Sequence, residues 1–219
     1  VKASGMDVGH YEMGLKAEDF VVASRNYSNL KVKVTDGYLD ITPVTEEITV
    51  KITGNIGSLE YNGNNRSITG YITDVGTKPI SVELKEGAAA VAGGRDAGHY
   101  PMNLKAEDFA VQSSVYKNIK VEVEDGYLDI TPIKGVVVKI RENSAEYLYD
   151  GQMHSVEGYE VVDINNNLYS TDAFKYKGKA LVRNDSAGTY EMEILPADFE
   201  NTDGNFAGVI FEVENGYLK

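Results

Sequence analysis

The chain has 219 residues, of which 21 are Lys or Arg and 34 are Asp or Glu, so its formal net charge at pH 7 is −13. An acidic surface repels phosphate backbones and anionic lipids, which makes nucleic acid and membrane surfaces poor partners. Because the chain has no cysteine, disulfides, thiolate metal sites and cysteine nucleophiles are excluded.

The segment 7–20, DVGHYEMGLKAEDF, belongs to a long internal repeat. It returns as DAGHYPMNLKAEDF at 96–109 and as SAGTYEMEILPADF at 186–199, and the spacings between Gly9, Gly98 and Gly188 are 89 and 90 residues. Between 9–43 and 98–132, 25 of 35 positions are identical. A period near 90 exceeds the roughly 20 to 50 residues of solenoid repeats and suits tandem globular β domains.

The repeats divide the chain into three expected domains. The front half of the repeat, at 48–71, returns more loosely at 136–159 and has no counterpart in the first 43 residues. We therefore expect a partial repeat at 1–43, a complete repeat at 44–132 and a nearly complete repeat at 133–219, with small interfaces near Pro43 and Pro132. Since half a repeat supplies only one apolar layer, we expect a neighbouring chain or upstream sequence to cover 1–43, and not the complete repeats.

Alternating apolar residues predict strands in every repeat. In LKVKVTDGYLDITP, at 30–43, apolar and polar residues alternate on both sides of Asp36-Gly37. Asp-Gly and Asn-Gly favour two-residue type I′ turns, so we predict a hairpin here and at the matching Asp125 and Asn215. No segment longer than about eight residues has a helical apolar period. The expected fold is all-β: small immunoglobulin-like sandwiches in an elongated array, or β-grasp-like modules as the alternative.

His10 and His99 could act as general bases, because histidine titrates near neutral pH. The third repeat has Thr189 at this position, and no motif of a catalytic nucleophile accompanies the histidines. We expect both to be exposed strand residues. No catalytic residue is predicted, and the chain is not expected to be an enzyme.

An Asp-Phe pair recurs in all three repeats, and its aspartates are Asp19, Asp108 and Asp198. Glu18 with Asp19 could serve glycoside hydrolysis, yet adjacent residues of an extended chain point to opposite faces, and Ala197 replaces the glutamate in the third repeat. We expect the aspartate to accept hydrogen bonds from backbone amides of a turn, while the phenylalanine anchors that turn in the core.

Lys16 and Lys105 suggest an isopeptide bond, because lysines of bacterial surface β domains can join to Asn or Asp. Leu195 takes this position in the third repeat. Such a crosslink is therefore optional at best.

A calcium loop is the other chemistry that the sequence suggests, because Asp163, Asn165 and Asn167 match its first, third and fifth positions. Leu168 and Phe174 replace the glycine and the glutamate that such a loop needs. NTDGN at 201–205 is equally ambiguous. We expect polar loop tips, and predict no metal ligand, cofactor or cofactor-binding residue.

Each repeat has a tyrosine after a turn of small residues, at Tyr11, Tyr100 and Tyr190. This arrangement resembles the tyrosine corner of immunoglobulin-like sandwiches, with Met13, Met102 and Met192 where such a domain has its second cysteine. The resemblance implies that the rings are mostly buried and that each hydroxyl bonds to nearby backbone.

The whole chain resembles the bacterial repeat modules named for MBG and YDG motifs, which occur in tandem in large surface proteins. Tyr149-Asp150-Gly151 supplies the YDG motif, Tyr61-Asn62-Gly63 a degenerate version, and DGYLDITP and AGTY…ADF…NGYL follow in order. The resemblance implies secretion, in a Gram-positive bacterium, with the export signal and wall anchor outside this sequence.

The resemblance implies a structural spacer or stalk, part of a large adhesin, whose partners are neighbouring repeats of the same chain. The alternative is a module that binds glycan or host protein. Residues specific to the third repeat would then contact the ligand: Tyr147, Met153, His154, Tyr169 and Tyr176. Exposure of these rings on one face would favour binding, whereas burial in a core would favour the spacer.

Overall fold

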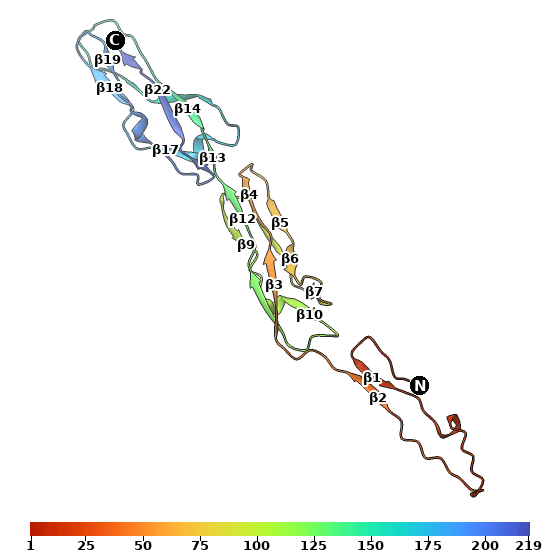
Figure 1. Ribbon diagram of the computed structural model, residues 1–219. Coiled ribbons are helices and arrows are strands. Elements are labelled where there is room, and N and C mark those ends of the chain that lie inside the picture. Colours follow the sequence, from red (N-terminus) through yellow and green to blue (C-terminus); the bar gives the residue numbers. More distant parts are fainter. The chain divides into compact units, whose positions relative to one another are not determined.

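The computed structural model describes residues 1–219, and the all-β prediction is confirmed (Figure 1). There is no α-helix, and so none that is long and apolar enough to span a membrane. Four 3₁₀ turns interrupt the strands: η1 (Ala17–Asp19), η2 (Ala106–Asp108), η3 (Thr171–Ala173) and η4 (Pro196–Asp198). The strands up to residue 132 are β1 (Gly9–Glu12), β2 (Tyr38–Ile41), β3 (Ile48–Gly54), β4 (Ile56–Glu60), β5 (Arg66–Thr69), β6 (Tyr71–Asp74), β7 (Ser81–Leu84), β8 (Val91–Gly94), β9 (Gly98–Pro101), β10 (Phe109–Gln112), β11 (Ile119–Glu124) and β12 (Tyr127–Thr131). The later strands are β13 (Ile133–Lys134), β14 (Val137–Glu142), β15 (His154–Glu157), β16 (Tyr159–Ile164), β17 (Phe174–Tyr176), β18 (Leu181–Asn184), β19 (Tyr190–Glu191), β20 (Phe199–Asn201), β21 (Phe206–Ala207), β22 (Ile210–Glu214) and β23 (Tyr217–Leu218).

Residue contacts group the chain into two compact units. The first comprises Val1–Asn55, Thr69–Ala90 and Met102–Gly126. The second comprises Ile56–Ile68, Val91–Pro101 and Tyr127–Lys219. Both units therefore include residues of the segment 44–132.

In the first unit, β3 is the central strand of a mixed three-stranded sheet. It pairs in parallel with β11 and antiparallel with β6, and β7 pairs separately with β10. The apolar alternation of β3 places Val50 and Ile52 in the core, whereas Lys51 between them is exposed. Burial of one face thus fixes the register of this strand.

In the second unit, β12 lies between β4, which is parallel to it, and β9, which is antiparallel. Likewise β14 lies between the parallel β22 and the antiparallel β16. Pairs β5–β8, β15–β18, β17–β20, β19–β23 and β13–β21 complete the sheets. Aromatic rings fill the core between them. The ring centroid of Phe211 lies 5.2 Å from that of Phe174 and 5.1 Å from that of Phe199.

The predicted Asp-Gly hairpins are wrong. β11 and β12 do not pair with each other, because β11 pairs with β3 and β12 with β4. The glycine between them, Gly126, does not adopt the positive φ of a type I′ turn. It is buried where a Cβ would collide with the backbone of Gly54. Glycine is therefore needed for close approach of two chain segments, which the dipeptide pattern does not reveal.

The strand predicted before Asp36 is absent, although the equivalent residues of the next repeat form β11. β11 is held by β3, and the segment 1–43 contains no counterpart of β3. Its two strands, β1 and β2, pair only with each other.

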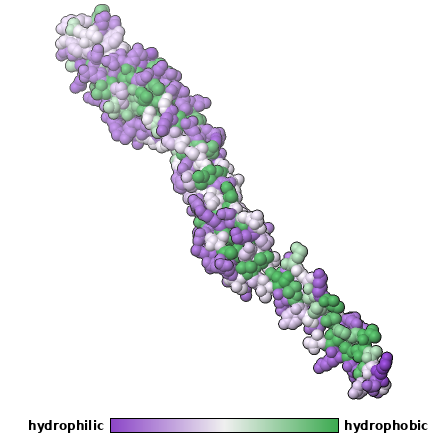
Figure 2. All heavy atoms as spheres, in the orientation of Figure 1, coloured by the Kyte–Doolittle hydropathy of each residue, from purple (hydrophilic) through white to green (hydrophobic).

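The apolar side chains of 1–43 remain largely uncovered. Phe20 is 46% exposed, whereas its equivalent Phe109 is 4% exposed, and Leu39 is 37% exposed against 0% for Leu128. Apolar residues are visible at the surface of this segment, which lies at the red end of the ribbon (Figures 1 and 2). That a neighbouring chain or upstream sequence covers them stays a prediction.

Candidate functional site

The recurring aspartates serve the fold, as predicted. Asp19 Oδ2 accepts a hydrogen bond from Lys16 N at 2.8 Å, and Asp108 and Asp198 accept the equivalent bonds at 2.7 and 3.0 Å. Each aspartate thereby closes a 3₁₀ turn. The following phenylalanine is buried in the two later repeats and exposed in the first, so its anchoring role is confirmed only where a core exists.

The two repeated histidines are exposed strand residues, as predicted. His10 Nδ1 lies 2.5 Å from Asp40 Oδ1, and His99 Nδ1 lies 2.6 Å from Asp129 Oδ1. These are directly opposed residues of paired strands. A hydrogen bond between directly opposed residues of two paired strands accounts for the position of each histidine.

The lysines considered for isopeptide bonds point to solvent. Lys16 Nζ lies 3.8 Å from Glu18 Oε1, and Lys105 Nζ lies 3.6 Å from Glu107 Oε1. Both are surface pairs of the kind that contribute little to stability.

In the possible calcium loop, the side chain of Asn165 is engaged by the backbone of another segment of the chain. Asn165 Oδ1 accepts a hydrogen bond from Val137 N at 2.9 Å, and Asn165 Nδ2 donates to Gly135 O at 3.1 Å. No group of three His, Cys, Asp or Glu side chains lies close enough together to hold a metal ion. Asn165 therefore joins two loops, as a polar loop tip would.

The tyrosine-corner hydrogen bond forms in two of the three repeats. Tyr11 Oη donates to Asp7 O at 2.8 Å, and Tyr100 Oη donates to Asp96 O at 2.7 Å. Tyr190 makes no such bond, and its ring lines a pocket instead. All three rings are half-buried, so the prediction that they are mostly buried is only partly met.

Carboxylates that bind backbone amides lie beside each predicted turn, and their arrangement differs between repeats. In the second repeat, Asp125 Oδ1 accepts hydrogen bonds from Leu104 N and Gly126 N, both at 2.9 Å. Asp36 accepts the equivalent bonds from Leu15 N and Gly37 N in the first repeat. These bonds, led by that from Leu15, lower the pKa of the Asp36 carboxyl.

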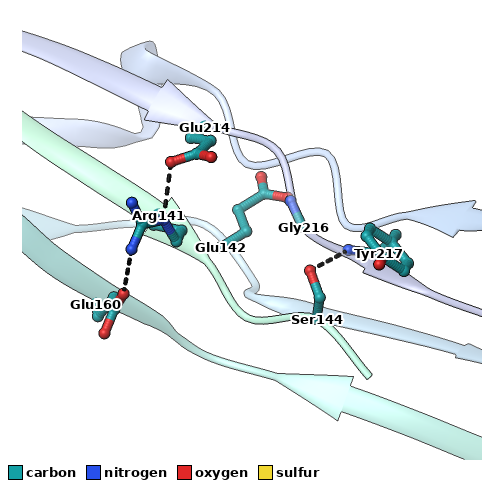
Figure 3. A network of polar contacts seen from close by, with 7 residues as sticks. All are labelled: Arg141, Glu142, Ser144, Glu160, Glu214, Gly216 and Tyr217. Carbon is teal, nitrogen blue, oxygen red and sulfur yellow. Dashed lines mark hydrogen bonds and ion pairs between the residues drawn. The ribbon is translucent and has the colours of Figure 1, made fainter. Parts of the chain in front are cut away.

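In the third repeat, Glu142, at the end of β14, takes over the role of this aspartate. Asn215 stands where the other repeats have aspartate, and the 2% exposed Glu142 of β14 accepts hydrogen bonds from Ile194 N at 2.6 Å and Gly216 N at 2.7 Å. Figure 3 shows the carboxylate of Glu142 next to Gly216. The equivalent position in the second repeat is Gly54. The paired exchange of Gly54 with Asp125 for Glu142 with Asn215 is visible in the aligned repeats, but sequence reasoning missed it.

The neighbouring Arg141 forms a surface network on the opposite face of β14. Its Nε lies 2.8 Å from Glu214 Oε2 and its Nη1 lies 3.0 Å from Glu160 Oε1, which joins three adjacent strands (Figure 3). These hydrogen bonds, first that which Arg141 donates to Glu214, raise the pKa of Arg141. The charged face is consistent with a strand that faces solvent on one side.

A pocket of about 300 Å³ lies in the third repeat, next to the YDG motif. Its lining includes the aromatic residues Tyr147, Tyr149 and Tyr190, and also Leu218 of β23. Tyr147 stacks on His154, with ring centroids 4.3 Å apart and an interplanar angle of 20°. An apolar pocket with a few polar groups at its rim is the usual form of a small-ligand site.

Asp150 of the YDG motif organises the edge of this pocket. Its Oδ1 accepts a hydrogen bond from Gln152 N at 2.9 Å and lies 2.9 Å from His154 Nε2. These two interactions, first that with Gln152, lower the pKa of the Asp150 carboxyl. Asp150 thereby orients the imidazole ring on which Tyr147 stacks.

The residues specific to the third repeat divide between surface and core. Tyr147 and Met153 are 49% and 60% exposed, and His154 lines the pocket. Tyr169 is 4% exposed, and the ring centroid of Tyr176 lies 4.9 Å from that of Phe199. Tyr147, Met153 and His154 are therefore accessible to a ligand. Tyr169 and Tyr176 instead pack in the core.

The second and third repeats also touch within the second unit, next to Pro132. The ring of Tyr61 packs edge-on against Phe206 at 5.8 Å, and Tyr61 is only 8% exposed. Ala97 N donates a hydrogen bond to Asn205 Oδ1 at 2.6 Å, and Asn205 Nδ2 donates to Asp96 Oδ1 at 3.2 Å. The ambiguous NTDGN segment thus forms part of a contact between repeats.

Comparison with known proteins gives no relative: no protein-family model, no curated protein and no solved structure matches this chain.

Proposed function

We propose that the chain is a non-enzymatic array of tandem structural repeats, which acts as an elongated spacer in a secreted bacterial cell-surface protein, part of a large adhesin of the MBG/YDG type. One observation carries this proposal: the methionine and phenylalanine side chains that recur between the complete repeats occupy core positions. Met102 and Met192 are 7% and 5% exposed, and Phe109 and Phe199 are 4% and 7% exposed. A spacer requires that each repeat fold stably, and these recurring residues supply the core of each complete repeat.

The pairing of strands bears on the kind of module. An immunoglobulin-like sandwich consists of antiparallel sheets. In each complete repeat an early strand instead pairs in parallel with a late one, β3 with β11 and β14 with β22. This parallel pairing supports the β-grasp-like alternative over the immunoglobulin-like one.

A surface-display experiment tests the spacer proposal. The chain is placed between a cell-wall anchor and a peptide epitope on a Gram-positive cell, and binding of a bulky antibody conjugate to the epitope is measured. We expect antibody binding to increase when one chain is inserted and again when two are inserted. Variants with Tyr147→Ser or Tyr149→Ser should behave like the unchanged chain, because a spacer needs no ligand. No increase with inserted length would contradict the proposal.

A second candidate function, binding of glycan or host protein, is favoured by the pocket next to the YDG motif. Exposed tyrosine rings offer flat faces for sugar rings, and the polar rim offers hydrogen-bond partners. A glycan array probed with the whole chain tests this candidate. Binding that is lost in Tyr149→Ala but kept in the matched Tyr38→Ala, whose tyrosine is exposed and lies outside the pocket, would support it.

A further inference from the structure

The pocket in the third repeat lies on the surface that corresponds to the one by which the second repeat receives the third. In the alignment of the repeats, Tyr149 corresponds to Tyr61, and Ser186-Ala187 corresponds to Asp96-Ala97. All of the third-repeat positions line the pocket. The occupied surface in the second repeat therefore shows what the open one is shaped to hold.

At the junction between the second and third repeats, two adjacent residues of the third repeat make the contact. Phe206, itself 3% exposed, covers the ring of Tyr61, and Asn205 bonds through its amide to Ala97 N and Asp96 Oδ1. The backbone of the same loop is fixed by a hydrogen bond from Ile133 N to Asn205 O at 2.9 Å. An aromatic ring and one amide thus join consecutive repeats.

In the pocket of the third repeat, the residues that correspond to Tyr61, Asp96 and Ala97 are accessible for the same contact. Tyr149 is 73% exposed, in contrast to 8% for Tyr61, and Ser186 and Ala187 are exposed. The pocket volume of about 300 Å³ suffices for an aromatic ring, because apolar cavities of about 150 Å³ accept benzene.

The inserting aromatic residue also recurs in every repeat. The residues that correspond to Phe206 are Tyr27 in the first repeat and Tyr116 in the second. Tyr27 follows Asn26, which corresponds to Asn205, and is 71% exposed. Both halves of the contact, the receiving tyrosine and the inserting ring, are thus part of the repeat itself.

We propose that the pocket beside Tyr149 is the docking site for another repeat of this type, which inserts the aromatic residue equivalent to Phe206. The inserted ring packs on Tyr149 as Phe206 packs on Tyr61. The carbonyl of an adjacent Asn accepts a hydrogen bond from Ala187 N, and its amide donates to Ser186 Oγ. This inference rests on the proposed function as a repeat array, and it assigns the pocket to assembly and not to a glycan.

An extended chain tests the inference directly. Lys219 corresponds to Asp129, so a second copy of residues 130–219 appended after Lys219 continues the repeat in register. The chain contains no Trp, so Tyr149→Trp in the original copy supplies a single fluorophore in the pocket. The matched control carries Phe206→Ser in the appended copy alone, which removes the inserting ring and leaves the original junction intact.

We expect the tryptophan emission to shift to shorter wavelength in the extended chain, and quenching by acrylamide to fall several-fold. The Phe206→Ser control should restore the values of the unextended chain. The amide signals of Ser186 and Ala187, compared with and without the appended repeat in the otherwise unsubstituted chain, give the same information without tryptophan.

Three outcomes would overturn the inference. If the appended repeat folds, as judged by dispersed amide signals, and the tryptophan stays exposed, docking is refuted while the spacer proposal stands. If the appended repeat fails to fold, the repeat is not a module and both proposals fail. If a saccharide changes the emission of the unextended chain and the appended repeat does not, the pocket is a glycan site.

Discussion

The buried carboxylate of Glu142 gives the sharpest test of how the third repeat is stabilised. It accepts two short hydrogen bonds from backbone N–H groups, those of Ile194 and Gly216, and its side chain is almost fully buried. Replacement by Gln keeps the size of the side chain and one oxygen. The other oxygen becomes an NH₂ group that faces an N–H donor, so one backbone amide loses its acceptor.

The expected cost follows from these two contacts. A hydrogen bond to a charged acceptor contributes about 1.5 to 3 kcal/mol, and an unsatisfied buried donor costs about 1 to 3 kcal/mol. Because these effects overlap in one site, we expect Glu142→Gln to destabilise the third repeat by about 3 kcal/mol. In a domain of this size, 1 kcal/mol shifts the melting temperature by about 4 to 8 °C.

The second repeat supplies the matched control. The double variant Glu142→Gly with Asn215→Asp copies the arrangement of Gly54 and Asp125, in which the aspartate accepts from the equivalent amides. We expect it to recover most of the stability that Glu142→Gly alone loses. Urea unfolding, followed through the amide signals of Ile194 and Gly216, measures all three variants. An effect below about 0.5 kcal/mol for Glu142→Gln, or no recovery in the double variant, would refute the reasoning.

Four further predictions follow from burial, backbone conformation and charge. Phe109→Ala should cost about 3 to 5 kcal/mol, as for other buried aromatic residues. The matched Phe20→Ala should cost less than about 1 kcal/mol because its ring is 46% exposed, and equal losses in chemical denaturation would show that 1–43 has a covered core. Glu193 has φ 63° where the first repeat has Gly14 at φ 74°. Glu193→Gly should therefore stabilise the third repeat by about 0.5 to 1 kcal/mol in the same assay, and a loss of stability would contradict the strain. The carboxyl of Asp36 should titrate below its ordinary pKa of 3.8, chiefly because Leu15 N donates to it, so its contribution to stability is present above pH 3.8 and is lost as pH falls through the lowered pKa. A carbon-detected NMR titration that finds a raised pKa would disprove this. Burial, and secondarily Asp203, raise the pKa of Tyr169 to about 12, so the stability from its neutral form is present below pH 10 and is lost as pH rises from 10 towards 12. Ultraviolet titration should show Tyr169→Phe removing the last tyrosine to ionise, and an unchanged final step would contradict the assignment.

The sequence predicted those features that depend on local alternation and on recurrence. Alternating apolar residues predicted strands in every repeat, in agreement with the all-β fold, and the recurrence of Asp-Phe in three repeats predicted a structural turn. Exposure of His10 and His99 likewise followed from the loss of histidine in the third repeat.

The sequence failed where the outcome depends on partners far along the chain. The Asp-Gly dipeptide has the local preference of a hairpin, but parallel pairing of β11 with β3 determines the path of the chain there. Residues 30–35 have the alternation of β11 and form no strand, because alternation alone does not supply a neighbouring strand. The YDG motif was recognised by resemblance, yet its position beside a pocket depends on loops at 147–154 and 184–190 that come together only in the fold.

Small-angle X-ray scattering of the whole chain tests the central claim, that the repeats form an extended spacer, most directly. A compact globule of this length has a radius of gyration of about 17 Å, and an unfolded chain about 50 Å. We expect an intermediate value, well above that of the globule, together with a Kratky plot typical of folded domains and a distance distribution with a long tail. A radius of gyration near 17 Å would contradict the claim.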